Sequence, residues 1–332
     1  MIQARLKTIL FIFLLWGAFT VLLGAYARIN DAGLGCPDWP GCFGQILAPT
    51  SDSQLEKVSA GYNVLSDNTP LKAWLEMIHR YAASAFGSFL IGFSFYILTN
   101  RNYLHKRWSG VFIISLVVFQ ALLGMWTVTW KLHPLVVMGH LMGGLTLTAI
   151  LYWLYLDVGK KDHALFAEHS NKSSKLVGFG LLFVVIQLVL GGWTSATYSG
   201  PICATFPLCE GSLWPEMNFS EGFYPLLTIG KNYQGGLFSH SGRVAIQMVH
   251  RYWAFVVTAY LVFLSFKMFK RSQKSFKWIL LVLTTLSLQV IVGILNVWWF
   301  LPISLAVLHN GLALLLLLLM VGWYHAARKD LA

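Results

Sequence analysis

The chain has 332 residues, of which 57% are hydrophobic and only 11% are charged, and its mean hydropathy is +0.63. A soluble domain carries about 25% charged residues to keep its surface hydrated, so this composition excludes a soluble enzyme, a disordered protein and a fibrous protein. The net charge of +11 is not spread over a basic face with interleaved aromatic residues, which nucleic-acid binding would need. We therefore expect a membrane protein that has lipid, and no nucleic acid, as its partner.

Eight apolar stretches are long enough to cross a bilayer, which takes about 20 residues as a helix. In chain order the predicted spans are residues 8–27, 77–99, 108–130, 135–156, 176–197, 246–266, 278–300 and 303–326. The last two are divided at Pro302, because proline lacks a backbone donor and clashes with the preceding turn. The sequence thus predicts an all-α polytopic membrane protein.

Basic residues near the span ends predict the orientation of the helices. One set of connecting segments holds 16 of the Lys and Arg residues and the other set holds 8. Both termini are therefore expected in the cytoplasm, and two long loops, about 28–76 and 198–245, are expected outside. Ala25-Tyr26-Ala27 after the first apolar run also fits a cleaved signal peptide, but the length of that run favours a retained helix. No Arg- and Ser-rich transit segment precedes it, which favours a bacterial plasma membrane.

The sequence contains an internal repeat with an offset of 167 to 171 residues. Residues Leu23-Gly24, Cys36 and Cys42 recur as Leu190-Gly191, Cys203 and Cys209; His79-Arg80-Tyr81 recurs as His250-Arg251-Tyr252; and Gln120, Gly124 and His140 recur as Gln289, Gly293 and His309. Spans 1–4 and 5–8 are therefore expected to be two tandem, pseudo-symmetric four-helix bundles in the same orientation. The predicted domains are residues 1–160 and 176–332, joined by a cytoplasmic linker at 161–175.

Four histidines, His79, His140, His250 and His309, lie inside spans at matched positions of the repeat. Ionisable residues within a bilayer are costly and are candidates for function, although a packing role is the alternative for any one of them. Four of the others lie in or beside cytoplasmic segments and are expected to be solvated: His105, His163, His169 and His325. His240 is expected in an outer loop. His133 is at an outer boundary, where a direct role is left open.

The depth of the four histidines in their spans predicts two pairs, His79 with His140 and His250 with His309, both near the outer face. Two imidazoles inside a four-helix bundle can bind one haem iron, so two bundles predict two haem sites. Zinc would need further ligands at each site. The sequence has no C-x-x-C-H motif, which excludes covalent c-type haem.

Charged and polar neighbours distinguish the two predicted sites. Arg80 and Arg251 follow the paired histidines and could bind haem propionates, as guanidinium suits bidentate pairing, or could extend to the interface. Glu76 precedes His79 by three residues, so both lie on one helix face. Its counterpart is Gln247, which cannot take up a proton. Glu76 is therefore a candidate general base, with an interfacial capping role as the alternative.

The four cysteines form two pairs in the outward loops, each with five residues between the two cysteines. Four cysteines allow three connectivities, and we expect local bridges, Cys36–Cys42 and Cys203–Cys209, because each pair is close in sequence and duplicated as a unit. The outward location is oxidising. A structural bridge and a redox-active bridge both remain open.

Together, the eight spans in two halves, the segment Glu76-Met77-Ile78-His79-Arg80, the outer cysteine pair and the three later histidines resemble haem A synthase of the bacterial type. The resemblance covers nearly the whole chain. It implies an enzyme that oxidises the C8 methyl group of haem O to a formyl group, giving haem A for cytochrome oxidase. It also implies that His79 and His140 hold the substrate haem, that His250 and His309 hold a permanent haem b, and that Glu76 is catalytic.

Two other functions remain possible from the sequence. One is a two-haem membrane cytochrome that only relays electrons, and the other is a haem carrier or oxidase assembly factor without chemistry. A relay needs no base beside only one haem, and a carrier needs no permanent haem, so Glu76 favours the enzyme. Haem O synthase and cytochrome oxidase assembly factors are the protein partners that the resemblance implies.

Overall fold

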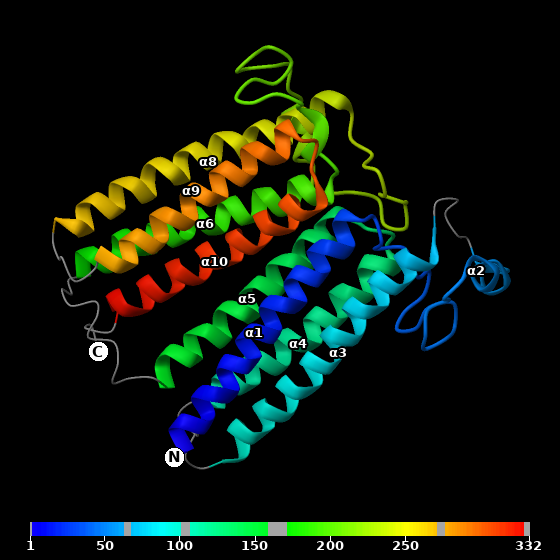
Figure 1. The fold of residues 1–332 in the computed structure, drawn as a ribbon, viewed down its shortest axis with the longest axis horizontal. Coiled ribbons are helices and arrows are strands. Elements are labelled where there is room, and N and C mark those ends of the chain that lie inside the picture. Colours follow the sequence, from blue (N-terminus) through cyan, green and yellow to red (C-terminus); the bar gives the residue numbers. More distant parts are fainter. Residues whose placement is uncertain (1, 63–67, 101–106, 159–170, 271–275, 329–332) are drawn as a thin grey trace. The chain divides into compact units, whose positions relative to one another are not determined.

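The computed structural model describes residues 2–62, 68–100, 107–158, 171–270 and 276–328, and all regular elements in these ranges are helices (Figure 1). Eight of them are long and apolar enough to cross a membrane, which confirms the predicted spans. These are α1 (Ile2–Ile29), α3 (Pro70–Thr99), α4 (Arg107–Thr129), α5 (Pro134–Val158), α6 (Asn171–Ala196), α8 (His240–Phe269), α9 (Phe276–Trp298) and α10 (Ile303–Arg328). Three short elements lie in the long loops: α2 (Asp52–Ser59), η3 (Gly200–Ile202) and α7 (Phe219–Gly222).

Helices α3 and α8 begin six or seven residues before the predicted spans, because polar capping residues start each helix ahead of its apolar stretch. The Thr69 side chain accepts a hydrogen bond from the Lys72 backbone nitrogen at 3.3 Å, and Pro70 occupies the first turn. The Ser239 hydroxyl accepts from the Gly242 nitrogen at 3.2 Å. N-caps of this kind satisfy backbone donors that have no partner within the helix.

Four membrane helices, α1, α4, α6 and α9, end with the same backbone turn. Each has a residue with positive φ just after the helix: Asp31 (50°), Lys131 (49°), Tyr198 (56°) and Phe300 (55°). The next residue donates its N–H to a carbonyl five residues back: Ala32 to Ala27, Leu132 to Thr127, Ser199 to Thr194 and Leu301 to Asn296, at 2.7–2.9 Å. This is the Schellman arrangement, and at the end of α9 it provides the break predicted at Pro302.

The helices gather into two compact units, which we name after the histidines they contain. The His79 unit comprises Leu15–Leu147 and Pro225–Leu237, and the His250 unit comprises Met1–Leu14, Thr148–Tyr224 and Phe238–Ala332. The predicted tandem bundles, their domain limits and the cytoplasmic termini stay predictions. Of the predicted linker, residues 161–170 lie outside the described part of the chain and 171–175 begin α6.

Each unit has its own apolar core. In the His250 unit, α6, α8, α9 and α10 lie side by side (Figure 1) and bury residues such as Val177, Leu261, Val282 and Met320. In the His79 unit, α3 packs against α4, and the loop after α1 folds back onto the first turns of α3. Many side chains on the outer faces of these helices are large, apolar and exposed, as expected of surfaces that contact lipid.

Candidate functional site

In the His79 unit, α3 and α5 bring His79 and His140 together. Their ring centroids are 6.3 Å apart and the ring planes are nearly perpendicular, at 88°. Two imidazoles that bind one metal ion from opposite sides have ring centres about 6 Å apart, because each metal–nitrogen bond is about 2 Å long. The predicted pair therefore has the spacing that a shared iron requires.

In the His250 unit, each predicted ligand contacts a glutamine on a neighbouring helix. The Gln187 side-chain nitrogen lies 3.2 Å from His250 Nδ1, and the Gln289 side-chain nitrogen lies 3.3 Å from His309 Nε2. This unit thus places both of its intramembrane histidines in polar contacts inside the helix bundle.

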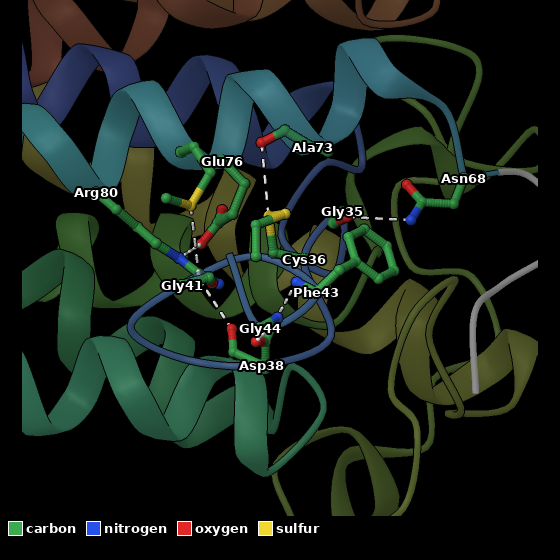
Figure 2. Close-up of a disulfide and its surroundings, with 12 residues drawn as sticks. Gly35, Cys36, Asp38, Gly41, Phe43, Gly44, Asn68, Ala73, Glu76 and Arg80 are labelled. Atoms are coloured by element: carbon green, nitrogen blue, oxygen red, sulfur yellow. Dashed lines mark hydrogen bonds and ion pairs between the residues drawn. A yellow bond between two sulfur atoms is a disulfide. The ribbon is translucent and has the colours of Figure 1, made fainter. Parts of the chain in front are cut away.

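Glu76 and Arg80 form a buried ion pair one turn apart on α3 (Figure 2). Arg80 Nε donates to Glu76 Oε1 at 2.9 Å, and both side chains are about nine-tenths buried. Burying two charges is costly, and close, well-aligned pairing between them offsets part of that cost. The carboxylate is therefore held in one position on the same helix as His79.

Arg80 also binds the loop that carries the first cysteine pair, as Figure 2 shows. Its Nη1 donates to the Asp38 carbonyl at 2.8 Å and to the Gly41 carbonyl. The same nitrogen also donates to the Pro40 carbonyl. The Asp38 carboxylate in turn accepts from the Phe43 and Gly44 nitrogens, each at 2.7 Å. The cation therefore connects the candidate base to a folded loop.

Arg251 makes the equivalent contacts with the second loop. Its Nη1 donates to the Thr205 and Leu208 carbonyls at 2.8 and 3.2 Å, and its Nη2 donates to the Cys203 carbonyl at 3.1 Å. Gln247 does not pair with it, since Gln247 Oε1 and Arg251 Nε are both buried without a hydrogen-bond partner. The two sites therefore differ at the position where Glu76 stands.

The loop contacts of both arginines were not predicted from the sequence, where haem propionates were the expected partners. The sequence did contain a signal of a shared role for these residues, because the whole triplet His-Arg-Tyr recurs in the second half. The tyrosines of that triplet also bind the loops: the Tyr81 hydroxyl donates to the Ile46 carbonyl and the Tyr252 hydroxyl to the Leu213 carbonyl. In each triplet, the histidine is the candidate ligand while the next two residues hold a loop.

Both predicted local disulfides, Cys36–Cys42 and Cys203–Cys209, are present in the structure. All four cysteines are buried, in small apolar clusters formed with Met77 of α3 or Met248 of α8. Each bridge closes a loop that also has a short antiparallel backbone contact, Cys42 with Gln45 or Cys209 with Ser212. The loops are thus compact elements packed onto the helices that carry the histidines.

The remaining histidines have other partners. His325 was expected to be solvated, and this is wrong: only 3% of it is exposed, and it bonds Asp157 at 3.0 Å beside the Trp153 ring. His133 is also buried, with its Nε2 3.3 Å from the Leu227 carbonyl and its ring against Tyr233. His240 pairs with Glu210 at the surface. The others, His105, His163 and His169, lie outside the described residues.

Comparison with known proteins identifies the family. The family model described as cytochrome oxidase assembly protein (COX15-CtaA) matches residues 7–321. The chain belongs to this family. It is 39% identical to the heme A synthase of Shewanella oneidensis over 318 residues, covering 96% of this chain and 95% of that protein. It is 26% identical to the heme A synthases of Neorickettsia sennetsu, covering 90% and 91% of the two chains, and Pelagibacter ubique, covering 87% of each.

In this member of the family, the histidine nitrogens of the two candidate sites fit a haem better than they fit a bare metal ion. Within the described ranges no cluster of three or more His, Cys, Asp or Glu residues could hold a metal, whereas a porphyrin supplies the other ligands itself and needs only axial side chains. The Nδ1 atoms of His79, His140 and His309 and Nη2 of Arg80 are buried without a partner. Such orphaned groups are expected where a polar ligand binds.

Proposed function

We propose that this chain is a haem A synthase that oxidises the C8 methyl group of haem O to a formyl group, in successive hydroxylations. Its family and its relatives named heme A synthase support an enzyme with haem as substrate and product. The observation that carries the assignment to particular residues is the His79–His140 pair at 6.3 Å, because His79 lies on the same helix, α3, as the buried Glu76.

In this proposal the His79 unit binds the substrate haem. His79 and His140 would supply the nitrogen ligands that hold its iron. Glu76 would act as a base beside the reacting methyl group. Replacing a C–H bond by a C–O bond with water as the oxygen source releases two protons and two electrons; the carboxylate would accept a proton, and the electrons would leave to an external acceptor. Arg80 keeps that carboxylate in place through the 2.9 Å ion pair.

The His250 unit holds a permanent haem b, with His250 and His309 as iron ligands. When bound, haem b supplies one-electron transfer. Gln247 occupies the position of Glu76 and has a neutral amide in place of a carboxylate, so it cannot accept a proton and this unit can bind haem without acting as a base. The Gln187 amide beside His250 Nδ1 would orient that imidazole, as neighbours that hydrogen-bond to metal ligands commonly do.

We further propose a bacterial plasma membrane as the location, with both termini in the cytoplasm and both haem sites near the outer face. The excess of Lys and Arg in alternate segments supports that orientation. Haem O synthase and cytochrome oxidase assembly factors are the proposed protein partners, as the substrate must be delivered and the product collected.

Pigment extraction from the purified protein tests the proposal against its two rivals. A synthase should yield haem b together with haem O or haem A, and cells that express it should gain haem A. A relay cytochrome would yield haem b alone. A carrier would yield haem O or haem A with no haem b, and either of these two results would overturn the assignment.

A further inference from the structure

Each of the four candidate haem ligands packs against a glycine on a neighbouring membrane helix. A Cβ atom added to the glycine would lie very close to Cε1 of the imidazole: 2.9 Å for Gly24 and His79, 3.4 Å for Gly124 and His140, 3.1 Å for Gly191 and His250, and 3.1 Å for Gly293 and His309. Contacts of 3.0–3.4 Å are tighter than most real Cβ contacts, and contacts below 3.0 Å require a shift. Each imidazole edge therefore occupies the space that an alanine methyl would fill.

The four glycines also occupy the same place on their helices, α1, α4, α6 and α9. Each lies seven residues before the positive-φ residue that ends its helix, from Gly24 to Asp31 and likewise at the other three. Seven residues correspond to about 10 Å along a helix axis. The same contact is thus made four times at the same distance from a helix end, which a chance packing gap would not produce.

Other glycines in these membrane helices do not share the contact. Gly92 on α3 has nothing within 4 Å of an added Cβ, and Gly139, which neighbours His140 in sequence, would meet only Leu123 at 3.8 Å. Glycine is a poor helix former, so four glycines at equivalent positions need a reason. Close approach of a bulky group to the helix is the usual one in membrane bundles.

A polar contact one turn earlier reinforces the arrangement at three of the four positions. The residue four before the glycine is Gln120, Gln187 or Gln289, and each amide touches the same histidine as the glycine does. At the fourth position it is Thr20, whose hydroxyl bonds the Trp16 carbonyl at 2.9 Å instead. Gln187 and Gln289 contact the imidazole itself, whereas Gln120 donates to the backbone carbonyl of His140. The helix carrying the glycine therefore contacts the imidazole edge at all four positions, and contacts a ring nitrogen through an amide at two of them.

We propose that Gly24, Gly124, Gly191 and Gly293 are positioning residues, each of which fixes the location and ring orientation of one haem-ligating imidazole. The haem part of this inference rests on the proposed function. The packing part does not, because the contact exists in the protein itself. A methyl group at Gly24, Gly191 or Gly293 displaces the ring and so changes the ligand geometry at the iron, whereas at Gly124, the loosest of the four contacts, it only fills the space beside the ring.

The His250 unit offers the sharper test, because the haem proposed for it is a permanent one rather than a substrate. In Gly191→Ala and Gly293→Ala of the full chain, we expect the electron paramagnetic resonance signal of the low-spin haem to shift, or part of the haem to become high-spin or be lost. Gly92→Ala, the matched control in a membrane helix without the contact, should keep the wild-type spectrum and haem content. Wild-type spectra in both test variants would overturn the proposal, and so would equal changes in the control.

A thermal-unfolding cycle adds a second readout of the packing contact, one that does not use the haem spectrum. Gly191→Ala should lower the midpoint of unfolding when His250 is present. In the His250→Ala background, the same change should be neutral or raise the midpoint, because the clash is gone and alanine is the better helix former. A loss of equal size in both backgrounds would refute the contact. A wild-type protein that contains no haem b would instead refute the proposed function and leave this cycle interpretable.

Discussion

Arg80 binds a carboxylate and a loop at once, whereas its counterpart Arg251 binds a loop alone. The sequence predicts the positions of both arginines beside the paired histidines, but not these contacts. The loop carbonyls lie about 40 residues away along the chain, and no local pattern shows that the loop returns to its helix. His325 was misjudged for the same reason, because its partner Asp157 belongs to a different helix.

Removal of Arg80 should therefore be more harmful than removal of Arg251. We expect Arg80→Gln to lower the free energy of unfolding by about 3–5 kcal/mol, since it leaves the buried Glu76 without its cation. Arg251→Gln leaves no buried carboxylate without a cation and should lower the free energy of unfolding by less. Thermal or denaturant unfolding of the purified variants measures both changes.

The double variant Arg80→Gln/Glu76→Gln serves as the control for this explanation. It removes the uncompensated carboxylate and should recover part of the lost stability. If it is less stable than Arg80→Gln alone, or if Arg80→Gln and Arg251→Gln are equally destabilised, the ion pair does not have the role assigned to it.

At the scale of elements, the apolar pattern predicts the eight membrane helices well, because about 20 apolar residues in a row have few other solutions. The starts of α3 and α8 are less predictable from hydropathy, as they depend on the caps Thr69 and Ser239. The short helices α2 and α7 lie in loops that the sequence analysis left without structure. Of these two, α7 carries Glu221, which accepts hydrogen bonds from Ser239 at the start of α8.

The contact between α7 and α8 predicts a local dependence on pH. The Ser239 hydroxyl and backbone N–H both donate to the Glu221 carboxylate, and these bonds hold the pKa of Glu221 below its ordinary value of 4.5. A lowered folded-state pKa means that the stabilisation is present above pH 4.5 and is lost as the pH falls through the folded pKa. The wild-type protein should lose thermal stability there.

The variant Glu221→Gln isolates this contribution, because it keeps the size of the side chain but has no charge to titrate. We expect the difference in unfolding midpoint between wild type and variant to shrink as the pH falls from 7 toward 3.5. The explanation fails if that difference stays constant across the range, since the acid sensitivity would then come from other groups.

At the scale of the whole molecule, the internal repeat and the distribution of Lys and Arg predict more than local geometry can. They predict two tandem bundles, termini in the cytoplasm and disulfide loops outside. The sequence could indicate the paired histidines because their spacing recurs. It could also indicate that the two sites differ in acid–base chemistry, because Glu76 in the first half corresponds to Gln247 in the second. It could not indicate which glycines touch the histidines, since that depends on how neighbouring helices pack.

Reporter fusions test the proposed orientation. A fusion after residue 165 should be active only as a cytoplasmic reporter, and one after residue 225 only as an external reporter, because basic residues are retained on the cytoplasmic side. External activity of the fusion at 165 would reverse the topology and move the haem sites to the other face.

The catalytic assignment depends on Glu76, the acid–base difference between the two histidine-bearing helices α3 and α8. The variant Glu76→Gln resembles the arrangement at Gln247 beside Arg251, so the fold and haem b should be retained. Loss of a positioned base costs about 10²–10⁴-fold in rate. The matched control Gln247→Glu should still make haem A.

The decisive measurement is extraction and chromatography of the haems from cells that express each variant. We expect Glu76→Gln to accumulate haem O or a partly oxidised haem, with haem A nearly absent and haem b at its normal level. Haem A at near wild-type levels in Glu76→Gln would contradict the account, because Glu76 would then serve only as the partner of Arg80.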